Sequence, residues 1–544
     1  MWARAVAPAR VELLLAVTSS ALLILSFPNF DLWPLAWVAL VPLLIAVCRR
    51  PQALPSFLLG WITGTLFFFG SCYWLTYAMV RYGGIPSLFA YPLLIPGAMV
   101  LGLFPALCCL LIARMVARRG LVALYLAPLF WTPLEWSRLG VTGQLWNAVG
   151  YSQAYVTPMI QSASWGGVYS VSFLIVMVNA GVSYAVMKRT SRAMLSALSA
   201  VASVAVIIAA SNWYTASHAS SQPTSQPEVV AVAVQPNVPM EPVEDLAETE
   251  ALVERHKQLS RSALVAWERE GRLDNAGAIK LEDNQAQPDA QAARKSIPRL
   301  VIWPESPMNF SYANDSVMRE WLARFAAENH TAVIFNSLEP APASGAYNSA
   351  VMVDEEGRKV AQYDKIRLLP FGEYVPLPRW LPGANLVPVM VGDFTPGAQY
   401  PLMQVAGARV GVFICFESAF PSISREFANE GADALINISN DGYLGPTPVM
   451  RQHLANTVFR AVENGRAVVR VTNTGISAYI TPRGQVIGAT EGFKPDVRVW
   501  AIRRAPGGKT FYTRFGDLFA GICAALSLLI LGTTIRKSRL NSEG

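Results

Sequence analysis

The thiol of Cys415 is the first side chain in this sequence whose chemistry needs an explanation. It lies at the end of the apolar run that opens the segment GVFICFESAF at residues 411–420, and it is the only cysteine between residues 110 and 522. A free thiol can be a small buried hydrophobe. It becomes a nucleophile when a base removes its proton and a cation stabilises the thiolate. The segment alone leaves both interpretations open.

Two acids and a lysine follow other predicted strands. Glu305 lies at the end of VIWPES, and Lys365 and Glu373 lie in the polar and aromatic segment YDKIRLLPFGEYVP. Glu305 is suited to act as the base and Lys365 as the cation. The backbone N–H of Phe416 and the Lys365 ammonium could together hold an oxyanion. Each residue alone fits a turn or an ion pair, so only the combination indicates nucleophilic catalysis.

The elements around these residues indicate an α/β domain. Short β-branched runs, bounded by Gly, Asn, Asp and Pro, are typical of buried strands. They are VVAVAVQPN, RLVIWPES, HTAVIFNS, NSAVMVDEEGRKV, ARVGVFICFES, GADALINISN and RAVVRVTNTG. The segments DSVMREWLARFAAENH and PVMRQHLANTVFRAVENGR predict helices between them, and His453 on the second is expected to be structural. We place the domain at 214–514, with a linker at 217–228 and a polar, mobile insertion at 271–297.

The rest of the chain has the composition of a membrane protein. Hydrophobic residues make up 53% of the 544 residues and charged residues 15%, and the mean hydropathy is +0.32. These values are too apolar for an ordinary soluble protein. The net charge of +7 is not gathered on one run, which argues against a nucleic acid partner.

Eight apolar stretches are candidate membrane spans, and most are close to the roughly 20 residues that cross a bilayer as a helix. Seven fill residues 1–213, and an eighth precedes a short tail in residues 515–544. Their approximate bounds are 11–28, 33–48, 55–80, 88–113, 121–137, 160–187, 194–212 and 516–535.

The basic residues of the short loops predict the orientation of these spans. Most fall on one side: Arg4, Arg10, Arg49, Arg50, Arg114, Arg118, Arg119, Lys188, Arg189, Arg192, Arg536, Lys537 and Arg539. Both termini are therefore expected in the cytoplasm of a bacterium, and the α/β domain in the periplasm, on the outer side of the inner membrane. Cysteines in that oxidising compartment usually pair. Cys415 has no other cysteine in its domain and is expected to be free.

The order of these residues resembles the nitrilase superfamily, whose domain is an α-β-β-α sandwich. The flanking spans narrow the resemblance to the apolipoprotein N-acyltransferase family, across nearly the whole chain. The motifs that carry it are WPES (303–306), YDKIRLLPFGEYVP (363–376), ICFES (414–418), NISNDGYLG (437–445), FRAVENGR (459–466), TNTG (472–475) and LEWSRLGVTGQLWNAVGYSQ (134–153).

The resemblance implies a reaction and a role for each residue. Cys415 would attack the sn-1 ester of a phospholipid, typically phosphatidylethanolamine, to form a thioester. The α-amino group of a diacylated apolipoprotein would then take the acyl chain. Glu305 would be the general base and Lys365 the oxyanion cation. Glu373 would orient Lys365, and Glu417 would shape the pocket. The reaction would need no metal or cofactor, because a thioester already holds the acyl group in activated form. We expect a monomer.

The same resemblance suggests substrate contacts in the membrane half. Glu135 and Arg138 lie three residues apart near the end of an apolar stretch, where ionisable groups are costly and often functional. Trp146, with Trp131 and Trp136, fits an interfacial aromatic belt. Tyr151, with Ser152 and Gln153, would contact head groups, and Tyr443 stands where the family usually has tryptophan.

Three other functions remain to be weighed. A membrane-anchored amidase of the nitrilase type would use the same three catalytic residues, with water as acceptor, but would not need seven preceding spans. A transporter is disfavoured because the spans hold few paired ionisable residues. A scaffold would leave Glu305, Lys365 and Cys415 without a purpose.

Overall fold

The chain folds into two compact units. A computed structural model describes residues 8–219, 228–240, 245–273, 279–281, 296–305, 308, 310–342, 345–375, 394–505 and 508–543. Unit 1 consists of Met1–Thr76, Ile85–Ala216 and Thr510–Gly544. Unit 2 consists of Tyr77–Gly84 and Ser217–Lys509.

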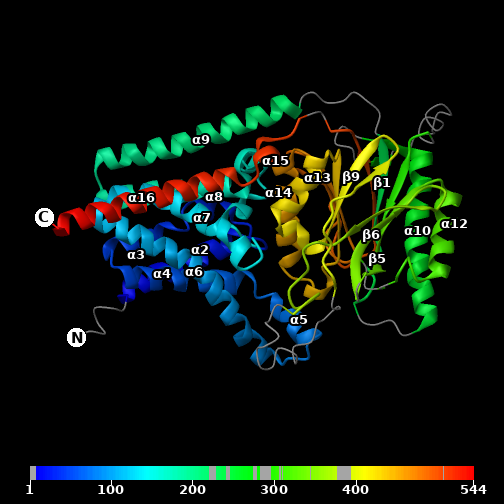
Figure 1. Cartoon of the computed structure of the whole chain (residues 1–544), viewed down its shortest axis with the longest axis horizontal. Helices are drawn as coiled ribbons and strands as arrows, with labels where there is room; N and C mark the ends of the chain where they lie inside the picture. The colour runs from blue at the N-terminus through cyan, green and yellow to red at the C-terminus, as the bar shows by residue number, and fades with distance from the viewer. Residues whose placement is uncertain are drawn as a thin grey trace. The chain divides into compact units, whose positions relative to one another are not determined.

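Unit 1 is a bundle of apolar helices that lie side by side (Figure 1). Gly60 on α4 and Gly102 on α6 allow these two helices to approach closely, since a Cβ at Gly60 would lie 2.6 Å from the Pro105 carbonyl oxygen. The helices are α2 (Arg10–Ser26), α3 (Val41–Arg49), α4 (Ala53–Ser71), α6 (Ser87–Arg119), α7 (Ala127–Val141), α8 (Ala163–Lys188), α9 (Ser191–Ala219), α15 (Phe511–Phe515) and α16 (Leu518–Glu543).

Four helices in the described residues are long and apolar enough to cross a membrane. They are Ala53–Ser71, Ser87–Arg119, Ala163–Lys188 and Ser191–Ser217, and two shorter apolar helices lie at Trp33–Arg49 and Leu518–Thr534. Unit 1 therefore has the character of a polytopic membrane protein, as its composition predicts.

The prediction of one continuous apolar helix over residues 55–80 is wrong. Helix α4 ends at Ser71, and α5 (Leu75–Arg81) begins after a break. The indole of Trp74 donates to the Ser71 carbonyl at 3.0 Å, which satisfies one of the acceptors that a helix end leaves open. The segment Tyr77–Gly84 belongs to unit 2, where the ring of Tyr82 packs 5.7 Å from that of Tyr443.

Unit 2 contains two sheets of six strands. The first has the order β14-β1-β4-β5-β6-β7 and the second β13-β12-β11-β10-β9-β8. The first consists of β1 (Val229–Gln235), β4 (Arg299–Ile302), β5 (Ala332–Pro340), β6 (Ala346–Val353), β7 (Lys359–Asp364) and β14 (Asp496–Ile502). The second consists of β8 (Leu402–Val405), β9 (Ala408–Ile414), β10 (Ala434–Ser439), β11 (Ala467–Thr472), β12 (Ala478–Ile480) and β13 (Val486–Ile487).

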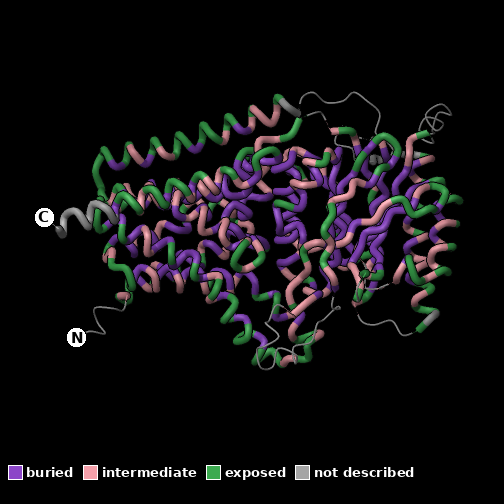
Figure 2. Tube along the Cα trace, in the orientation of Figure 1, coloured by how far each residue is buried: buried purple, intermediate pink, exposed green. Residues whose placement is uncertain are grey.

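Four helices cover the two sheets. Helices α10 (Leu246–Glu270) and α12 (Ser316–Asn329) pack on the first sheet, and α13 (Pro421–Glu430) and α14 (Val449–Asn464) pack on the second (Figure 1). The two sheets also contact each other, and most of their residues are buried (Figure 2). The predicted α-β-β-α sandwich is confirmed.

Every β-branched run named above contains a strand, but one contains two. NSAVMVDEEGRKV folds as β6 and β7, joined by a turn in which the Asp354 N–H donates to the Arg358 carbonyl oxygen at 3.0 Å. Within the predicted insertion 271–297, β2 (Gly271–Leu273) pairs with β3 (Ile279–Leu281). Residues 274–278 and 282–295 of that insertion, and 220–227 of the predicted linker, lie outside the described residues.

Parallel pairing sets where the polar side chains meet. β1, β4 and β5 run parallel in one sheet, and β9, β10 and β11 run parallel in the other. Parallel neighbours end at the same edge of a sheet. Glu305, Cys415 and Asp441 all follow the carboxyl ends of such strands, so the topology gathers these residues from distant parts of the sequence.

Candidate active site

Cys415 occupies a sharp turn between a strand and a helix. β9 ends at Ile414, and a 3-10 helix spans Cys415–Ala419. Cys415 itself has φ 50°, in the left-handed region that residues with a side chain rarely adopt. Such strain persists only where the surroundings hold it, and it is common at functional sites. The residue is partly exposed, unlike the other five cysteines, which are buried. A sealed structural thiol is therefore the poorer interpretation.

Lys365 lies between two carboxylates. Its Nζ is 2.9 Å from Glu373 Oε1 and 3.4 Å from Glu305 Oε1. The Lys365 and Glu373 side chains are 1% and 4% exposed, whereas Glu305 keeps 14%. A buried ammonium needs such partners to stay charged. Of the two acids, Glu305 is thus the one that retains access to the site.

Asn348 on β6 ties the two acids together. Its Nδ2 donates to Glu305 Oε1 and to Glu373 Oε1, each at 2.8 Å, and its own Oδ1 accepts from Asn336 Nδ2 at 2.7 Å. The Asn440 N–H donates to the other oxygen of Glu305 at 3.1 Å. These bonds hold the Glu305 carboxylate in one orientation.

Lys365 and Cys415 both stay protonated, so the lysine is charged and the thiol is neutral. Burial alone would lower the pKa of Lys365, but Glu305 and Glu373 raise it well above its ordinary value of 10.5. Burial, and then the charge of Glu305, raise the pKa of the Cys415 thiol above its ordinary value of 9.0, although Lys365 lowers it. Lys365 is a fixed cation, and Cys415 is a neutral thiol that needs a base when it reacts.

We predict that Cys415 is slow to alkylate at neutral pH, because its raised pKa keeps the thiolate fraction small. The rate of iodoacetamide modification should climb with pH up to about pH 9 without levelling off, since free cysteine titrates near 8.5. Peptide mass spectrometry of the full-length protein in detergent would follow this reaction. A rate that levels off below about pH 8 would mean that the thiolate is already stabilised in the resting protein.

Glu417 is buried and ties the turn at Cys415 to the loop that carries Lys365. One of its oxygens accepts from Tyr363 Oη at 2.7 Å and from the backbone N–H groups of Ile366 and Arg367 at 2.8 and 3.0 Å. The other oxygen accepts from the Ile414 N–H at 2.8 Å. The Glu417 carboxylate is thus occupied by donors and is in no position to serve as the base.

The aromatic residues Phe416 and Tyr443 lie close to this cluster. The Phe416 ring packs edge-on against Phe420 at 5.3 Å. Burial, followed by the charge of Glu305, raises the pKa of Tyr443, which places its hydroxyl in the field of the same carboxylates. Gly445, with φ +68°, ends the turn after Tyr443, and a Cβ there would lie 2.5 Å from the ring of Tyr77.

In unit 1, Glu135 and Arg138 fasten a loop to helix α7. Glu135 Oε1 accepts from the Val149 N–H at 2.9 Å and from Trp131 Nε1 at 3.2 Å. Arg138 donates to the Trp146 carbonyl oxygen and lies 4.8 Å from the centre of the Phe68 ring. Both side chains line an apolar pocket of unit 1. Their role toward a substrate stays a prediction.

The other predicted substrate contacts in unit 1 are packed inside it. Trp146 is 7% exposed and Tyr151 2%, and Gln153 is fully buried. Gln153 Oε1 accepts from Trp37 Nε1 at 3.1 Å, and its Nε2 donates to the Trp33 carbonyl oxygen at 3.0 Å. An aromatic belt that contacts lipid head groups would lie on the surface, whereas these three side chains are buried within unit 1. Contact of Trp146 or Tyr151 with lipid therefore remains a prediction.

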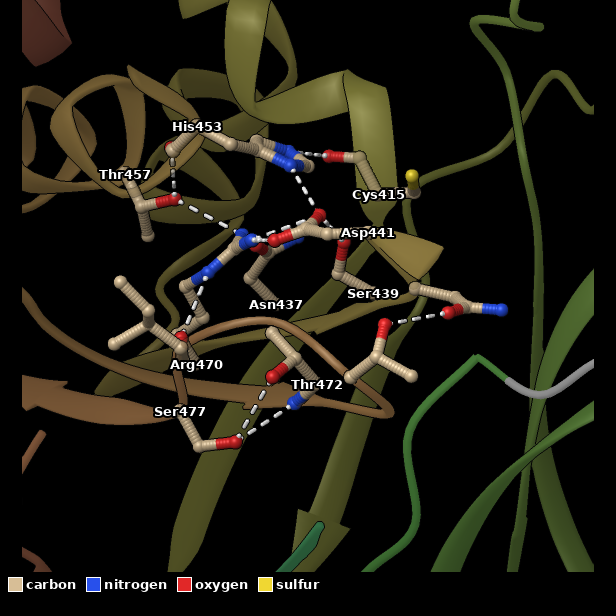
Figure 3. Close-up of polar contacts among 12 residues, drawn as sticks. Cys415, Asn437, Ser439, Asp441, His453, Thr457, Arg470, Thr472 and Ser477 are labelled. Carbon is tan, nitrogen blue, oxygen red and sulfur yellow. Dashed lines mark hydrogen bonds and ion pairs between the residues drawn. The ribbon is translucent and has the colours of Figure 1, made fainter. Parts of the chain in front are cut away.

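Sequence reasoning missed several polar residues around Cys415. Asn348 lies inside a strand run, and Asn440 and Asp441 lie in NISNDGYLG without an assigned role. Arg470 on β11 is fully buried, and it donates to Asp441 Oδ2 at 3.0 Å. His453 Nε2 donates to the Cys415 carbonyl oxygen at 2.9 Å (Figure 3). For Asn440 and Asp441, the motif NISNDGYLG was the one sequence signal that could have pointed to a role at the site.

The sandwich and its cysteine site define a carbon-nitrogen hydrolase domain, since the carbon-nitrogen hydrolase family model matches residues 230–510. A second model, the apolipoprotein N-acyltransferase N-terminal domain, matches residues 19–181. The chain is 33% identical to an apolipoprotein N-acyltransferase from Geobacter metallireducens, over 98% of this chain and 97% of that protein. It is 29% identical to one from Rhizobium meliloti, over 95% of each. The chain belongs to the apolipoprotein N-acyltransferase family and is an acyltransferase.

Solved structures of an amidase are also similar to about half of this chain. One form of the amidase from Nesterenkonia sp. AN1 is 19% identical to this chain, covers 54% of it and 97% of the amidase, and superposes with a TM-score of 0.36. That structure carries a covalent acetamide group on its active-site cysteine.

Proposed function

We propose that this protein transfers the sn-1 acyl chain of a phospholipid, phosphatidylethanolamine above all, through a thioester on Cys415. The acceptor is the α-amino group of the N-terminal diacylglyceryl-cysteine of an apolipoprotein. The observation that carries the proposal is a neutral thiol on a strained turn, in the field of a fixed cation and of a partly exposed carboxylate. This set is what a nucleophile with a separate base and oxyanion cation requires.

In the first half-reaction, Glu305 takes the proton of Cys415 as the sulfur attacks the ester carbonyl carbon. The carbonyl oxygen becomes an oxyanion, held by Lys365 Nζ and the Phe416 N–H. When this intermediate collapses, the bond to the glycerol oxygen breaks. Glu305 returns the proton to that oxygen, and a lysophospholipid leaves.

In the second half-reaction, the lipoprotein amine attacks the thioester carbonyl carbon, and Glu305 accepts a proton from the amine. The same oxyanion site holds the second intermediate. The carbon–sulfur bond then breaks, the sulfur regains a proton, and an amide is released. Glu373 keeps Lys365 in place, and Glu417 keeps the loop and the nucleophile turn together.

The membrane unit brings this site to its lipid substrates. We propose seven spans in residues 1–213, an eighth in 515–544 and a periplasmic domain in 214–514 of a monomer. The clustering of Lys and Arg in alternate loops supports this orientation. Glu135, Arg138, Trp146 and Tyr151 are the unit 1 residues that we assign to substrate contact, and Tyr443 is assigned to it in unit 2.

The proposal predicts a stable acyl-enzyme when the acceptor is withheld. Purified full-length protein, given a phospholipid with two different acyl chains, should gain the mass of the sn-1 acyl group on Cys415. Each adduct should be matched by one lysophospholipid. Addition of a diacylated lipopeptide with a free α-amino group should discharge the adduct and acylate the peptide. Intact-mass spectrometry of protein and peptide measures each step.

Cys415→Ala is the control and should form no adduct. An adduct on another residue, or N-acylation by the Cys415→Ala protein, would contradict the proposal. Discharge of the thioester to free fatty acid, with the lipopeptide left unmodified, would identify a hydrolase that uses water as its acceptor. The transfer function would then be wrong even though the thioester formed.

A further inference from the structure

The imidazole of His453 lies between the nucleophile and a buried acid. His453 is on α14, which packs on the second sheet and against the 3-10 helix that begins at Cys415. Its Nε2 is 2.9 Å from the Cys415 carbonyl oxygen, and its Nδ1 is 2.7 Å from Asp441 Oδ1. In Figure 3 the imidazole faces the carbonyl of Cys415, and the sulfur points away from it. The ring therefore contacts the backbone of the nucleophile and not its thiol.

Asp441 is held as a carboxylate. Arg470 donates to its Oδ2 at 3.0 Å, and Ser439 Oγ donates to its Oδ1 at 3.2 Å. Burial alone would raise the pKa of Asp441, but Arg470 and His453 lower it to about 2. Arg470 is itself fixed by a bond to Asn437 Oδ1. An ionised carboxylate can only accept hydrogen bonds.

Both ring nitrogens of His453 therefore face acceptors. The Cys415 carbonyl oxygen can only accept, so Nε2 carries the hydrogen of that bond and has no lone pair to offer the nucleophile as a base. His453 is suited to hold an acceptor in place.

The carbonyl oxygen that His453 holds belongs to the peptide group that also carries the proposed oxyanion donor, the Phe416 N–H. The carbonyl of Cys415 and the N–H of Phe416 belong to one planar trans peptide, so the two bonds point in opposite directions. Fixing the oxygen toward α14 fixes the N–H toward the other side. A donor on the oxygen also polarises the peptide and strengthens its N–H as a donor.

We propose that His453, held by Asp441 and Arg470, is a positioning residue that orients the Cys415–Phe416 peptide and so builds the oxyanion site. The inference rests on the proposed function, in which the Phe416 N–H stabilises the tetrahedral intermediates. It adds a physical reason for the left-handed Cys415, whose φ of 50° needs an external anchor. It also explains why a glycine ends the TNTG segment. A Cβ at Gly475 would collide with the Asp441 carboxylate, which holds His453.

The test separates oxyanion chemistry from simple packing. Phospholipid without acceptor would be given to four full-length proteins. They are the unchanged protein, His453→Leu, His453→Gln and the control His330→Gln, which changes an exposed residue. Two rates are measured on each: acylation of Cys415, which passes through an oxyanion, and iodoacetamide alkylation of Cys415, which does not. His453→Leu should acylate about 10- to 100-fold more slowly, because it weakens a donor whose complete loss costs about 10²–10³. Its KM for phospholipid and its alkylation rate should not change.

His453→Gln should recover most of the acylation rate, because the glutamine amide can place an N–H near the position of Nε2. Acylation by His453→Leu at the unchanged rate would overturn the inference. An equal loss of acylation and alkylation in both variants would also overturn it, since it would mark a structural tie only. If thermal unfolding in detergent shows that His453→Leu does not fold, His453→Gln decides by its acylation rate. Failure of the unchanged protein to form a thioester would instead contradict the proposed function.

Discussion

Glu305→Gln should slow acylation of Cys415 by about 10²–10⁴-fold, the usual contribution of a general base. Glutamine has the same shape, and its amide oxygen can still accept from Asn348 or from the Asn440 N–H. It cannot take a proton from the thiol. The thiol of Cys415 has a raised pKa, so little thiolate forms without help at neutral pH. The loss should therefore fall on the chemical step and leave phospholipid binding nearly unchanged.

The pH dependence makes this prediction sharper. Without its base, the variant depends on thiolate formed by the solvent, so its acylation rate should keep rising with pH where that of the unchanged protein has levelled off. Rapid-quench measurements of the acyl-enzyme from neutral to alkaline pH would record this. Glu320→Gln, at an exposed position of α12, is the matched control. Acylation by Glu305→Gln at the unchanged rate would assign the base to another residue.

Lys365→Met should lose both activity and stability. The substitution removes one oxyanion donor, for which a loss of about 10²–10³-fold in rate is usual. It also leaves Glu305 and Glu373 close together with no cation between them. Breaking a buried ion pair by removing one partner costs about 3–5 kcal/mol. Thermal unfolding of the protein in detergent, followed beside the acylation assay, would measure both effects.

A second substitution separates the two losses. In Lys365→Met with Glu373→Gln, one of the two facing carboxylates is neutral, so much of the stability should return. The rate should stay low, because no cation holds the oxyanion. Recovery of acylation in the double variant would show that Lys365 serves only to balance charge. If Lys365→Met were as stable as the unchanged protein, Lys365 would not stabilise the fold through its ion pairs with Glu305 and Glu373.

Most strands could be predicted, and the three residues of the proposed reaction could be singled out, because their signals are local. Short β-branched runs bounded by turn residues mark β1, β4, β5, β9, β10 and β11 directly. Glu305 and Cys415 follow two of these runs, which is where parallel strands deliver polar side chains. The strands β8, β12, β13 and β14 were missed, and β12 and β13 are so short that two or three residues carry no period.

The remaining site residues depend on pairings that no local pattern carries. Asn348 joins Glu305 to Glu373 only because β6 pairs with β7, which precedes the Lys365 loop, and β7 lies far from β4 in the sequence. Likewise, His453 has an ordinary place on an amphipathic helix. Its contact with Cys415 exists because α14 packs across the sheet that holds β9. Such roles require the tertiary structure.

The short segment Tyr77–Gly84 has a consequence for how the protein can be made. It lies between α4 and α6 in the sequence, yet it is part of the same compact unit as the cysteine site, with Tyr82 against Tyr443. A fragment that begins at residue 217 would lack this piece. The ribosome delivers this segment long before the strands that receive it, so unit 2 is complete only when both residues 77–84 and residues 217–509 have been made.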